Sequence, residues 1–404
     1  MTEKEFFRKT LGLEEPWEVA DVELDLEGKR VDVTVEVRAG TLWCEEGEQL
    51  PIAGYEEREW RHLDTMQLET TLRARVPRVR YPDGSTRMVK VPWAGERSRW
   101  TLSFEALAVE VLRASSSVSA AAAWLRLSWR SADGIMARAV ERGLGRRKLE
   151  DITEVGIDEK SYRKRHRYGT LVNDLKGARV IEVFEGRTTE AACGAFDSLG
   201  KEGLKKVEAV AMDMSAAYEA AAKIKCPGAA IVYDRFHVSA MLGDAVDKVR
   251  REEHAKLMAA GDQTLKGSKH DWLFCPSNMS EERYSRFEQL VKKNTKTSRA
   301  WYHRIMFKEF WDHPGATSAG EFFKRWFMHA VRSKLKPVVK VARSLKRHLP
   351  GLLNYFAHPI TNALSEGLNS RVQAVKAAAR GYHSFGTFRT RILFFLGGLD
   401  LKPR

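Results

Sequence analysis

The sequence predicts an α/β protein of several domains, and three patterns along its 404 residues lead to this prediction. Residues 31–37 alternate strictly between apolar and polar side chains, which is the period of a half-buried strand. Residues 152–238 alternate short apolar segments with helical ones, as in an α/β sheet. Residues 113–148 and 239–354 carry helical patterns without strand signals.

Composition limits the classes of partner and compartment. Apolar residues make up 43% of the chain, which excludes a wholly disordered protein. Lys and Arg number 68 against 54 Asp and Glu, and the net charge of +14 indicates a polyanionic partner, most often nucleic acid. An anionic membrane is the competing partner, but we find no lipidation signal and no run of 18 apolar residues. The start of the chain is not a signal peptide, and the four cysteines form no C-x-x-C pair, so we expect a cytoplasmic protein.

Residues 1–112 predict a small β-rich domain of hairpins, with a turn at 82–84. Residues 113–150 predict a helix-turn-helix, because a helix over 118–125 and a helix over 129–142 are joined by a short turn at 127–128. Gly143 and Gly145 are expected to close the second helix. An ordinary pair of packed helices is the alternative. The cations expected to contact DNA from the second helix are Arg130, Arg138 and Arg142.

Between residues 152 and 238 the predicted order is β-β-β-α-β-α-β. The expected strands are 155–157, 168–175, 179–184, 207–212 and 229–233, and the expected helices are 189–199 and 215–224. Three of these strands run directly into an aspartate, namely Asp158, Asp213 and Asp234. Strand ends are where an open α/β sheet builds its site. The order allows the first and fourth strands to be neighbours, which would bring Asp158 and Asp213 together.

The remaining residues are basic and helical. Residues 322–348 hold nine Lys or Arg and no acidic residue, which fits either a solvated face or a phosphate backbone. Trp301 is a candidate for stacking on an unpaired DNA base, although a tryptophan at helical spacing is more often a core residue. A further helix is expected over 361–379, stopped by Gly381.

Glu366 lies on that last helix, and Asn362 and Asn369 share its face because they are four residues before it and three after. Together with Asp158 and Asp213, Glu366 offers the hard oxygen ligands that Mg²⁺ prefers. Two such ions can activate water and stabilise the leaving oxygen of a phosphodiester. Two alternatives stay open at this point: an aspartate after a strand is often a turn or helix cap, and a lone helical glutamate is usually a surface residue.

Several short motifs together resemble the bacterial DDE transposases, in particular the ISL3 group of insertion sequences. The resemblance covers nearly the whole chain, including segments 61–64 and 91–94 and the helix-turn-helix. The motifs that carry it are Gly156–Glu159, Glu185–Arg187, Asp213–Ser215 with Tyr218, Asp234–His237 and Asn362–Asn369.

The resemblance implies an RNase H-like catalytic core over 151–238 and 355–404, interrupted by an all-α insertion over 239–354. It implies that Asp158, Asp213 and Glu366 bind two Mg²⁺ ions, for which Mn²⁺ substitutes. Asp234 is an alternative second ligand. His237 either contacts the scissile phosphate or is a core histidine. The residues expected to complete the site or to contact DNA beside it are Asn362, Asn369, Lys376 and Arg380.

The implied function is that of a transposase, which binds terminal inverted repeats, cleaves DNA and transfers the freed strand to target DNA. Two element ends must be joined, so a homodimer on DNA is expected, in a bacterial cytoplasm and associated with the nucleoid. A catalytically inactive, domesticated DNA-binding protein is the alternative, and a junction-cutting resolvase is a third hypothesis.

One departure from the family concerns zinc. Relatives usually carry an N-terminal zinc-binding segment with two cysteine pairs, whereas Cys44 is a single cysteine here. Tetrahedral zinc needs four good ligands, which Cys44 and His62 cannot supply. We therefore predict that this domain keeps its shape without zinc.

Overall fold

The computed structural model describes residues 2–45, 48–149, 151–163, 167–274, 278–360, 362–379 and 381–403, with the backbone alone for 362–366. The chain divides into two compact units. Unit 1 comprises Met1–Arg147 and Leu399–Arg404, and unit 2 comprises Lys148–Gly398.

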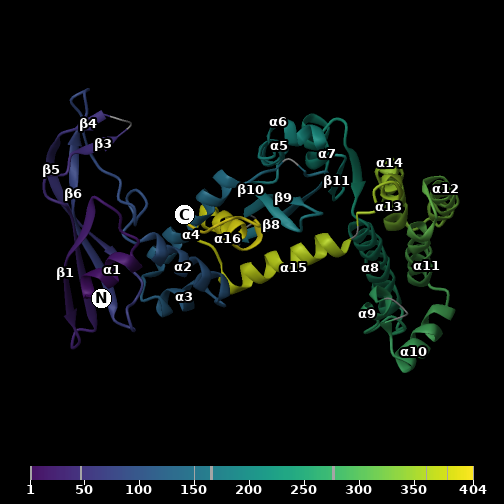
Figure 1. The fold of residues 1–404 in the computed structure, drawn as a ribbon. Coiled ribbons are helices and arrows are strands. Elements are labelled where there is room, and N and C mark those ends of the chain that lie inside the picture. Colours follow the sequence, from purple (N-terminus) through teal and green to yellow (C-terminus); the bar gives the residue numbers. More distant parts are fainter. Residues whose placement is uncertain are drawn as a thin grey trace. The chain divides into compact units, whose positions relative to one another are not determined.

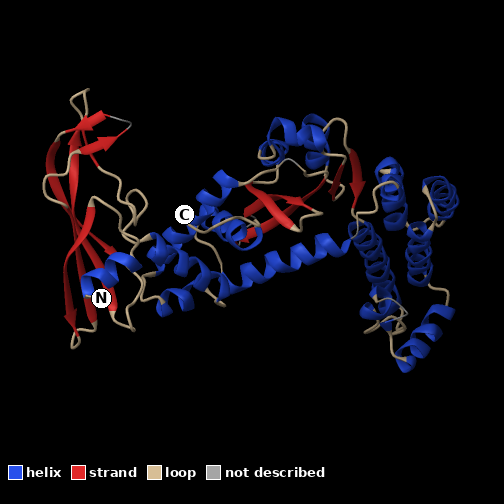
Figure 2. Cartoon of the chain, viewed as in Figure 1, coloured by secondary structure: helices blue, strands red, loops and turns tan. Residues whose placement is uncertain are grey.

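Unit 1 begins with helix α1 (Glu3–Thr10) and a five-stranded sheet (Figures 1 and 2). Its strands run in the order β1-β2-β6-β5, with β7 paired to β6. They are β1 (Trp17–Asp25), β2 (Arg30–Val37), β5 (Ile52–Arg61), β6 (Glu69–Arg80) and β7 (Thr86–Met88), beside a small hairpin of β3 (Trp43–Glu45) and β4 (Glu48–Leu50). The predicted strand over 31–37 is confirmed by β2, whose alternate residues Val31, Val33 and Val35 are buried.

Three helices complete unit 1: α2 (Leu102–Ala114), α3 (Val118–Trp124) and α4 (Trp129–Arg146). Helices α3 and α4 confirm the predicted pair, while α2 lies within the region expected to be β-rich. The prediction that Gly143 and Gly145 end the second helix is wrong, since α4 continues to Arg146. Gly143 serves close packing instead, because a Cβ there would lie 2.7 Å from the Cβ of Leu399.

The segment after Gly398 packs on α4. The guanidinium of Arg146 donates to the carbonyl of Lys402 at 2.6 Å, and the Leu401 side chain is buried. Residues 399–404, expected in the catalytic domain, therefore belong to the same compact unit as the helix-turn-helix.

Unit 2 contains a second five-stranded sheet, in the order β10-β9-β8-β11-β12 (Figure 1). The first three strands are antiparallel, and β11 is parallel to both β8 and β12. The predicted order of strands and helices is confirmed, with α6 as one unpredicted helix. The elements are β8 (Glu154–Arg163), β9 (Arg167–Asp174), β10 (Arg179–Glu185), α5 (Thr189–Asp197), α6 (Gly200–Lys206), β11 (Ala209–Met212), α7 (Ala216–Lys225) and β12 (Ala230–Tyr233).

After β12, the described residues up to Phe356 form helices and no strand. Their core is rich in aromatic side chains, where the ring of Phe307 contacts those of Phe310, Phe323 and Trp326. These elements are α8 (Arg235–Ala259), α9 (Lys269–Leu273), α10 (Glu281–Lys292), α11 (Lys296–Lys308), η2 (Glu309–Asp312), α12 (Ala316–Arg332), α13 (Lys336–Arg347), α14 (Leu349–Leu353) and η3 (Asn354–Phe356).

The chain then returns to the sheet through α15 (Asn362–Ala379), which confirms the predicted helix, and α16 (Phe385–Leu396). The return is anchored at β12. A Cβ at Gly351 would lie 2.4 Å from the Tyr233 ring, so only glycine permits this approach. The Asn354 side chain donates to the carbonyl of Ile231 at 2.8 Å. No helix in the described parts of the chain is long and apolar enough to cross a bilayer.

We predict that unit 1 loses stability on acidification because of His62. This side chain is buried and its Nδ1 lies 2.9 Å from the hydroxyl of Thr101, the residue that caps α2. Burial, with a smaller effect from Arg61, lowers the pKa of His62 from 6.5 to about 4. Between these two pKa values His62 is protonated in the unfolded chain but neutral in the folded chain. The free energy of unfolding therefore falls by about 2 kcal/mol between pH 7.5 and pH 5.

Thermal unfolding of unit 1 across this pH range measures the effect. The His62→Gln variant stays neutral and should lack that part of the pH dependence, whereas His383→Gln, at an exposed position, should retain it. Identical pH profiles for the two variants would contradict the prediction.

Candidate active site and DNA-binding helices

Strand register places the three predicted aspartates at one level of the sheet. Gly156 of β8 pairs with Ala211 of β11, and Met212 of β11 pairs with Tyr233 of β12. Asp158 and Asp213 each lie two residues after the first pair. Asp213 and Asp234 each lie one residue after the second pair. Neighbouring strands are about 4.8 Å apart, so the three backbones are adjacent at this level. The prediction that the first and fourth strands are neighbours is confirmed.

Asp158 lies inside β8 and not at its end, so that part of the prediction is wrong. Pairing with β11 stops at Gly156, but β9 continues to pair with β8 as far as Arg163. Pairing with the antiparallel strand β9 therefore extends β8 beyond Asp158. Asp158 consequently projects from a strand that is held on one side and open on the other.

The Asp213 carboxyl lies among other charged groups. Burial raises its pKa, and the negative charges of Asp158 and Glu159 raise it further, while His237 acts in the opposite direction. One oxygen of Asp213 accepts the backbone N–H of Ser215 at 3.1 Å. These influences require that Asp158, Asp213 and His237 lie within electrostatic reach of one another.

Asp158 holds a lysine ammonium. Its Oδ2 lies 2.7 Å from Nζ of Lys160, whose side chain is only 16% exposed. The pKa of Lys376, on α15, is lowered by burial and by the positive charge of Lys160. Helix α15 therefore passes close to this part of β8. Sequence reasoning missed Lys160, although period two along a strand puts it on the same face as Asp158.

Asp234 has a structural role that the sequence left open. It caps α8, with Oδ1 accepting the backbone N–H of Phe236 at 2.8 Å, while Oδ2 lies 3.9 Å from Nε2 of His237. The His237 side chain is 44% exposed, so it is not a core histidine. It lies at the surface beside Asp234 and within electrostatic reach of Asp213.

Tyr218 of the quoted motif is a buried partner of the cluster. Its hydroxyl lies 3.3 Å from that of Thr170, and burial raises its pKa, with added effects from Glu159, Asp213 and Asp158. Glu159 lies 3.6 Å from the Arg187 guanidinium of the Glu185–Arg187 motif. Residues of three of the quoted motifs are thus in contact with, or within electrostatic reach of, one another.

The third member of the predicted trio, Glu366, lies in α15. The Glu366 and Asn362 side chains and Arg380 lie outside the described residues. Asn369 is half-buried on α15, in helical register with Glu366. Among the side chains that the structure describes, which leave out Glu366, no three His, Cys, Asp or Glu are arranged to hold a metal ion.

Two of the three arginines expected to contact DNA are bound within unit 1. Arg138 donates from Nε to the Glu105 carboxylate at 2.9 Å, and Arg142 donates to its other oxygen at 2.9 Å. The Glu105 side chain is 3% exposed, so this network packs α4 against α2. Arg138 and Arg142 thus bind a carboxylate of the chain itself, and not solvent as a free DNA-contacting residue would. Arg130, in the first turn of α4, is exposed. Trp301 is 9% exposed and packs on Phe287 and Trp272, and is therefore a core residue.

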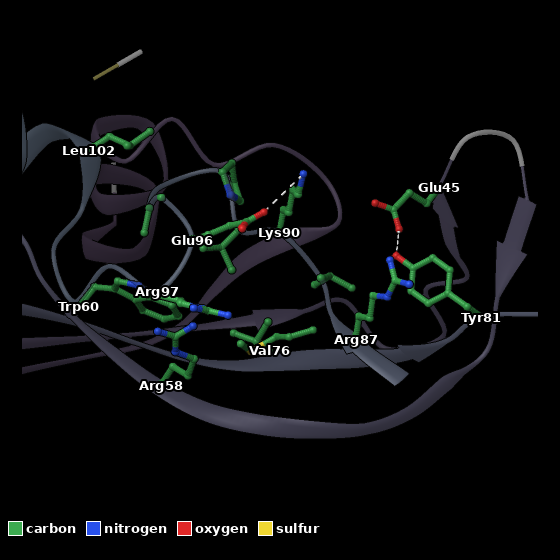
Figure 3. Close-up of a pocket in the computed structure, with 16 residues that line it drawn as sticks. Glu45, Arg58, Trp60, Val76, Tyr81, Arg87, Lys90, Glu96, Arg97 and Leu102 are labelled. Carbon is green, nitrogen blue, oxygen red and sulfur yellow. Dashed lines mark hydrogen bonds and ion pairs between the residues drawn. The ribbon is translucent and has the colours of Figure 1, made fainter. Parts of the chain in front are cut away.

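The segment predicted to lack zinc is held by polar and aromatic contacts (Figure 3). The Tyr81 hydroxyl donates to the Glu45 carboxylate, and the Arg87 guanidinium lies 4.8 Å from the centre of the Tyr81 ring. Cys44 is exposed, and His62 is buried against Thr101. Cys44 therefore lies at the surface, whereas His62 lies in the interior.

Comparison with known proteins agrees with this arrangement. Residues 155–392, more than half of the chain, match the DDE family of ISL3 elements, described as a transposase. The chain belongs to the ISL3 family of transposases. Residues 89–140 match the helix-turn-helix domain of transposase family ISL3, and residues 44–84 match the zinc-finger of transposases IS204, IS1001, IS1096 and IS1165.

Two relatives extend the similarity over most of the chain. The transposase for insertion sequence element IS1001 of Bordetella parapertussis is 28% identical over 312 residues, 76% of this chain and 77% of that one. The transposase for IS1557 of Mycobacterium tuberculosis is 25% identical over 419 residues, 94% and 92% of the two chains. This chain is thus an insertion-sequence transposase, an enzyme that cleaves DNA and transfers strands, with a helix-turn-helix DNA-binding domain. A domesticated, inactive protein is not favoured.

The zinc-finger match covers a segment with one cysteine, and the absence of zinc remains a prediction. Protein purified without added zinc should hold no stoichiometric zinc by elemental analysis. Cys44→Ser should change the stability of unit 1 by less than about 0.5 kcal/mol, because an exposed thiol contributes little. One tightly held zinc per chain would refute this.

Arg138 and Arg130 should separate packing from DNA contact. Arg138→Ala removes charge-assisted hydrogen bonds to a buried carboxylate, so it should destabilise unit 1 by about 1.5–3 kcal/mol. Arg130→Ala, at an exposed position, should weaken DNA binding while leaving the unfolding temperature nearly unchanged. Thermal unfolding and DNA titrations of both variants test this. Equal stabilities would show that the Glu105 network does not hold α4.

Proposed function

We propose that Asp158, Asp213 and Glu366 are the catalytic carboxylates of this transposase, and that together they bind two Mg²⁺ ions, with Mn²⁺ as a substitute. The observation that carries the proposal is the register of β8 and β11, which puts Asp158 and Asp213 at one level on adjacent strands. The supporting chemistry is the raised pKa of Asp213, because a divalent cation would relieve the repulsion between these half-buried carboxylates. DDE transposases as a class use divalent metal ions.

The catalytic domain, on this proposal, is RNase H-like and comprises residues 151–238 and 355–398, with residues 239–354 as an all-α insertion. Three antiparallel strands followed by two parallel ones support it. The anchoring of α14 and η3 on β12 explains how a long helical segment can be inserted without displacing the site. Residues 1–112 and 113–150 supply the β-rich and helix-turn-helix domains, with α2 packed against the latter.

Each side chain has a distinct task in the proposed reaction. Asp158, whose Oδ2 lies 2.7 Å from the Lys160 ammonium, would be one of the residues that hold the metal, and Lys160 would supply positive charge beside the phosphate. His237 is positioned by the cap residue Asp234 to donate a hydrogen bond to a phosphate oxygen. When bound, Mg²⁺ supplies Lewis-acid polarisation of the phosphodiester and lowers the pKa of the attacking water. Lys376 and Arg380 follow Glu366 on the chain and hold the DNA backbone beside the site.

The proposed substrates are the terminal inverted repeats of the element and a target duplex, brought together by a homodimer on DNA. The relatives named above act for the insertion sequences IS1001 and IS1557, which supports an element-specific substrate. The exposed Arg130 on α4 is the proposed first contact with the repeat.

Cleavage of DNA carrying the element's ends, with Mg²⁺ and with EDTA, tests the assignment. Asp158→Asn, Asp213→Asn and Glu366→Gln should each reduce cleavage about 10³-fold or more, because charge stabilisation of several kcal/mol is lost with the ion. DNA binding should remain or strengthen slightly, since a repulsive charge is removed. Asp244→Asn, an exposed aspartate on α8, is the matched control and should cleave normally.

Asp234→Asn distinguishes the two candidates for the second ligand. The cap on α8 survives in this variant, because an asparagine side chain also accepts at this position. Cleavage by Asp213→Asn but not by Asp234→Asn would overturn the assignment of Asp213.

A further inference from the structure

Helix α13 has two chemically opposite faces. Its apolar face is buried and consists of Val338, Val341, Ala342 and Leu345. Its other face is a row of cations at spacings of four, three and four residues, which places them along one side of the helix. This row consists of Lys336, Lys340, Arg343 and Arg347, all exposed.

The row lines a groove between α12 and α13, which we name the α12–α13 groove (both helices are labelled in Figure 1). Phe327 of α12 forms one wall, and the Lys346 ammonium lies 4.8 Å from the centre of its ring. No acidic side chain is among the lining residues described by the structure. The full lining is Phe327, Lys334, Lys336, Val339, Lys340, Arg343, Lys346 and Arg347.

Six like charges in one groove are unfavourable without a counter-charge. Cations four residues apart on a helix repel one another, and the summed potential of such a groove attracts polyanions. The ion pairs and hydrogen bonds found among the described residues include none to these six side chains. By contrast, Lys160, Arg138 and Arg142 are all held by carboxylates.

The dimensions of the groove suit a nucleic-acid backbone. Helix α13 has 12 residues and so a length of about 18 Å. One strand of a duplex presents a phosphate about every 3.4 Å along its axis, so about five phosphates can lie beside this helix. A membrane surface would need bulky apolar side chains on the exposed face, and the groove offers only Val339 and the half-buried Phe327.

We propose that the α12–α13 groove binds the sugar-phosphate backbone of duplex DNA, as a site separate from the helix-turn-helix and from the carboxylates. Helix α13 ends at Arg347, and the ring of the next residue, His348, lies 5.2 Å from that of Tyr233 on β12. The next residue after Tyr233 is Asp234. The groove thus leads along the inserted helices toward the edge of the sheet that carries the site, and it holds DNA in a sequence-independent manner. The proposal rests on the proposed function only in taking DNA near that site as the substrate.

The test is a titration of the full chain with a duplex of arbitrary sequence, about 40 base pairs long, at salt concentrations from about 50 to 200 mM. The variant replaces three cations of the row, with Lys340→Gln, Arg343→Gln and Arg347→Gln combined. The control combines Lys256→Gln, Lys269→Gln and Arg286→Gln, which removes the same charge from exposed positions of α8, α9 and α10. All six positions are exposed, so unfolding temperatures should match the wild type.

Loss of three phosphate contacts should make the negative slope of log K (the DNA association constant) against log salt concentration shallower by about 2.7. The ratio of wild-type to variant affinity should therefore fall roughly 40-fold between the lowest and the highest salt. The control variant should keep the wild-type slope. Equal slopes for the two triple variants would overturn the proposal.

Two further outcomes separate this proposal from its alternatives. Lower affinity of the row variant for vesicles of anionic phospholipid, with unchanged DNA affinity, would reassign the groove to a membrane and overturn the proposal. A normal cleavage rate in Asp158→Asn or Asp213→Asn would refute the proposed carboxylates, yet it would leave the salt slopes, and hence the groove, unaffected.

Discussion

Strand β11 pairs in parallel with β8 on one side and with β12 on the other, and the candidate active site of unit 2 depends on this pairing. The register brings residues 158, 213 and 234 to one level although they are separated by long stretches of chain. The Asp213 carboxyl is consequently buried next to like charges, which raises its pKa. The edge strand β12 accepts α14 and η3, so the helical insertion is attached beside the site and the sheet stays continuous. A one-residue shift in this register would turn every side chain of β11 to the opposite face.

The excess of positive charge is distributed in two distinct ways. Some cations neutralise carboxylates of the chain itself, as Arg138 and Arg142 do for the buried Glu105 and Lys160 does for the half-buried Asp158. Others, such as those of α13, face solvent in rows without a carboxylate among them. The first group contributes to folding and the second is available to a ligand. Net charge alone does not distinguish the groups, which is why a basic sequence indicates a polyanionic partner without locating its binding site.

Much of the fold of unit 2 could be predicted because its signals are local. Apolar segments and caps indicated β9, β10, α5, α7 and α15 close to their observed bounds. The features that were missed depend on contacts distant in sequence. Strand β8 continues past Asp158 because β9 pairs with it there. Arg138 is bound by Glu105, which lies 33 residues earlier in the chain. A side chain at position 143 would collide with Leu399. Of the site, the aspartates could be located from the strand pattern, but Lys160 and the cap role of Asp234 required the register and the helix geometry.

The contact between α4 and residues 399–402 bears on the timing of synthesis. The helix-turn-helix is complete by residue 147, yet the segment that packs on it is made about 250 residues later. At about 5–20 residues per second, a ribosome needs roughly 10–50 s to cover that distance. During this interval the nascent helices lack the Leu401 side chain and the carbonyl that binds Arg146. The DNA-binding unit thus reaches its final packing only after the whole catalytic domain has been translated, so a truncated chain carries an incomplete DNA-binding unit.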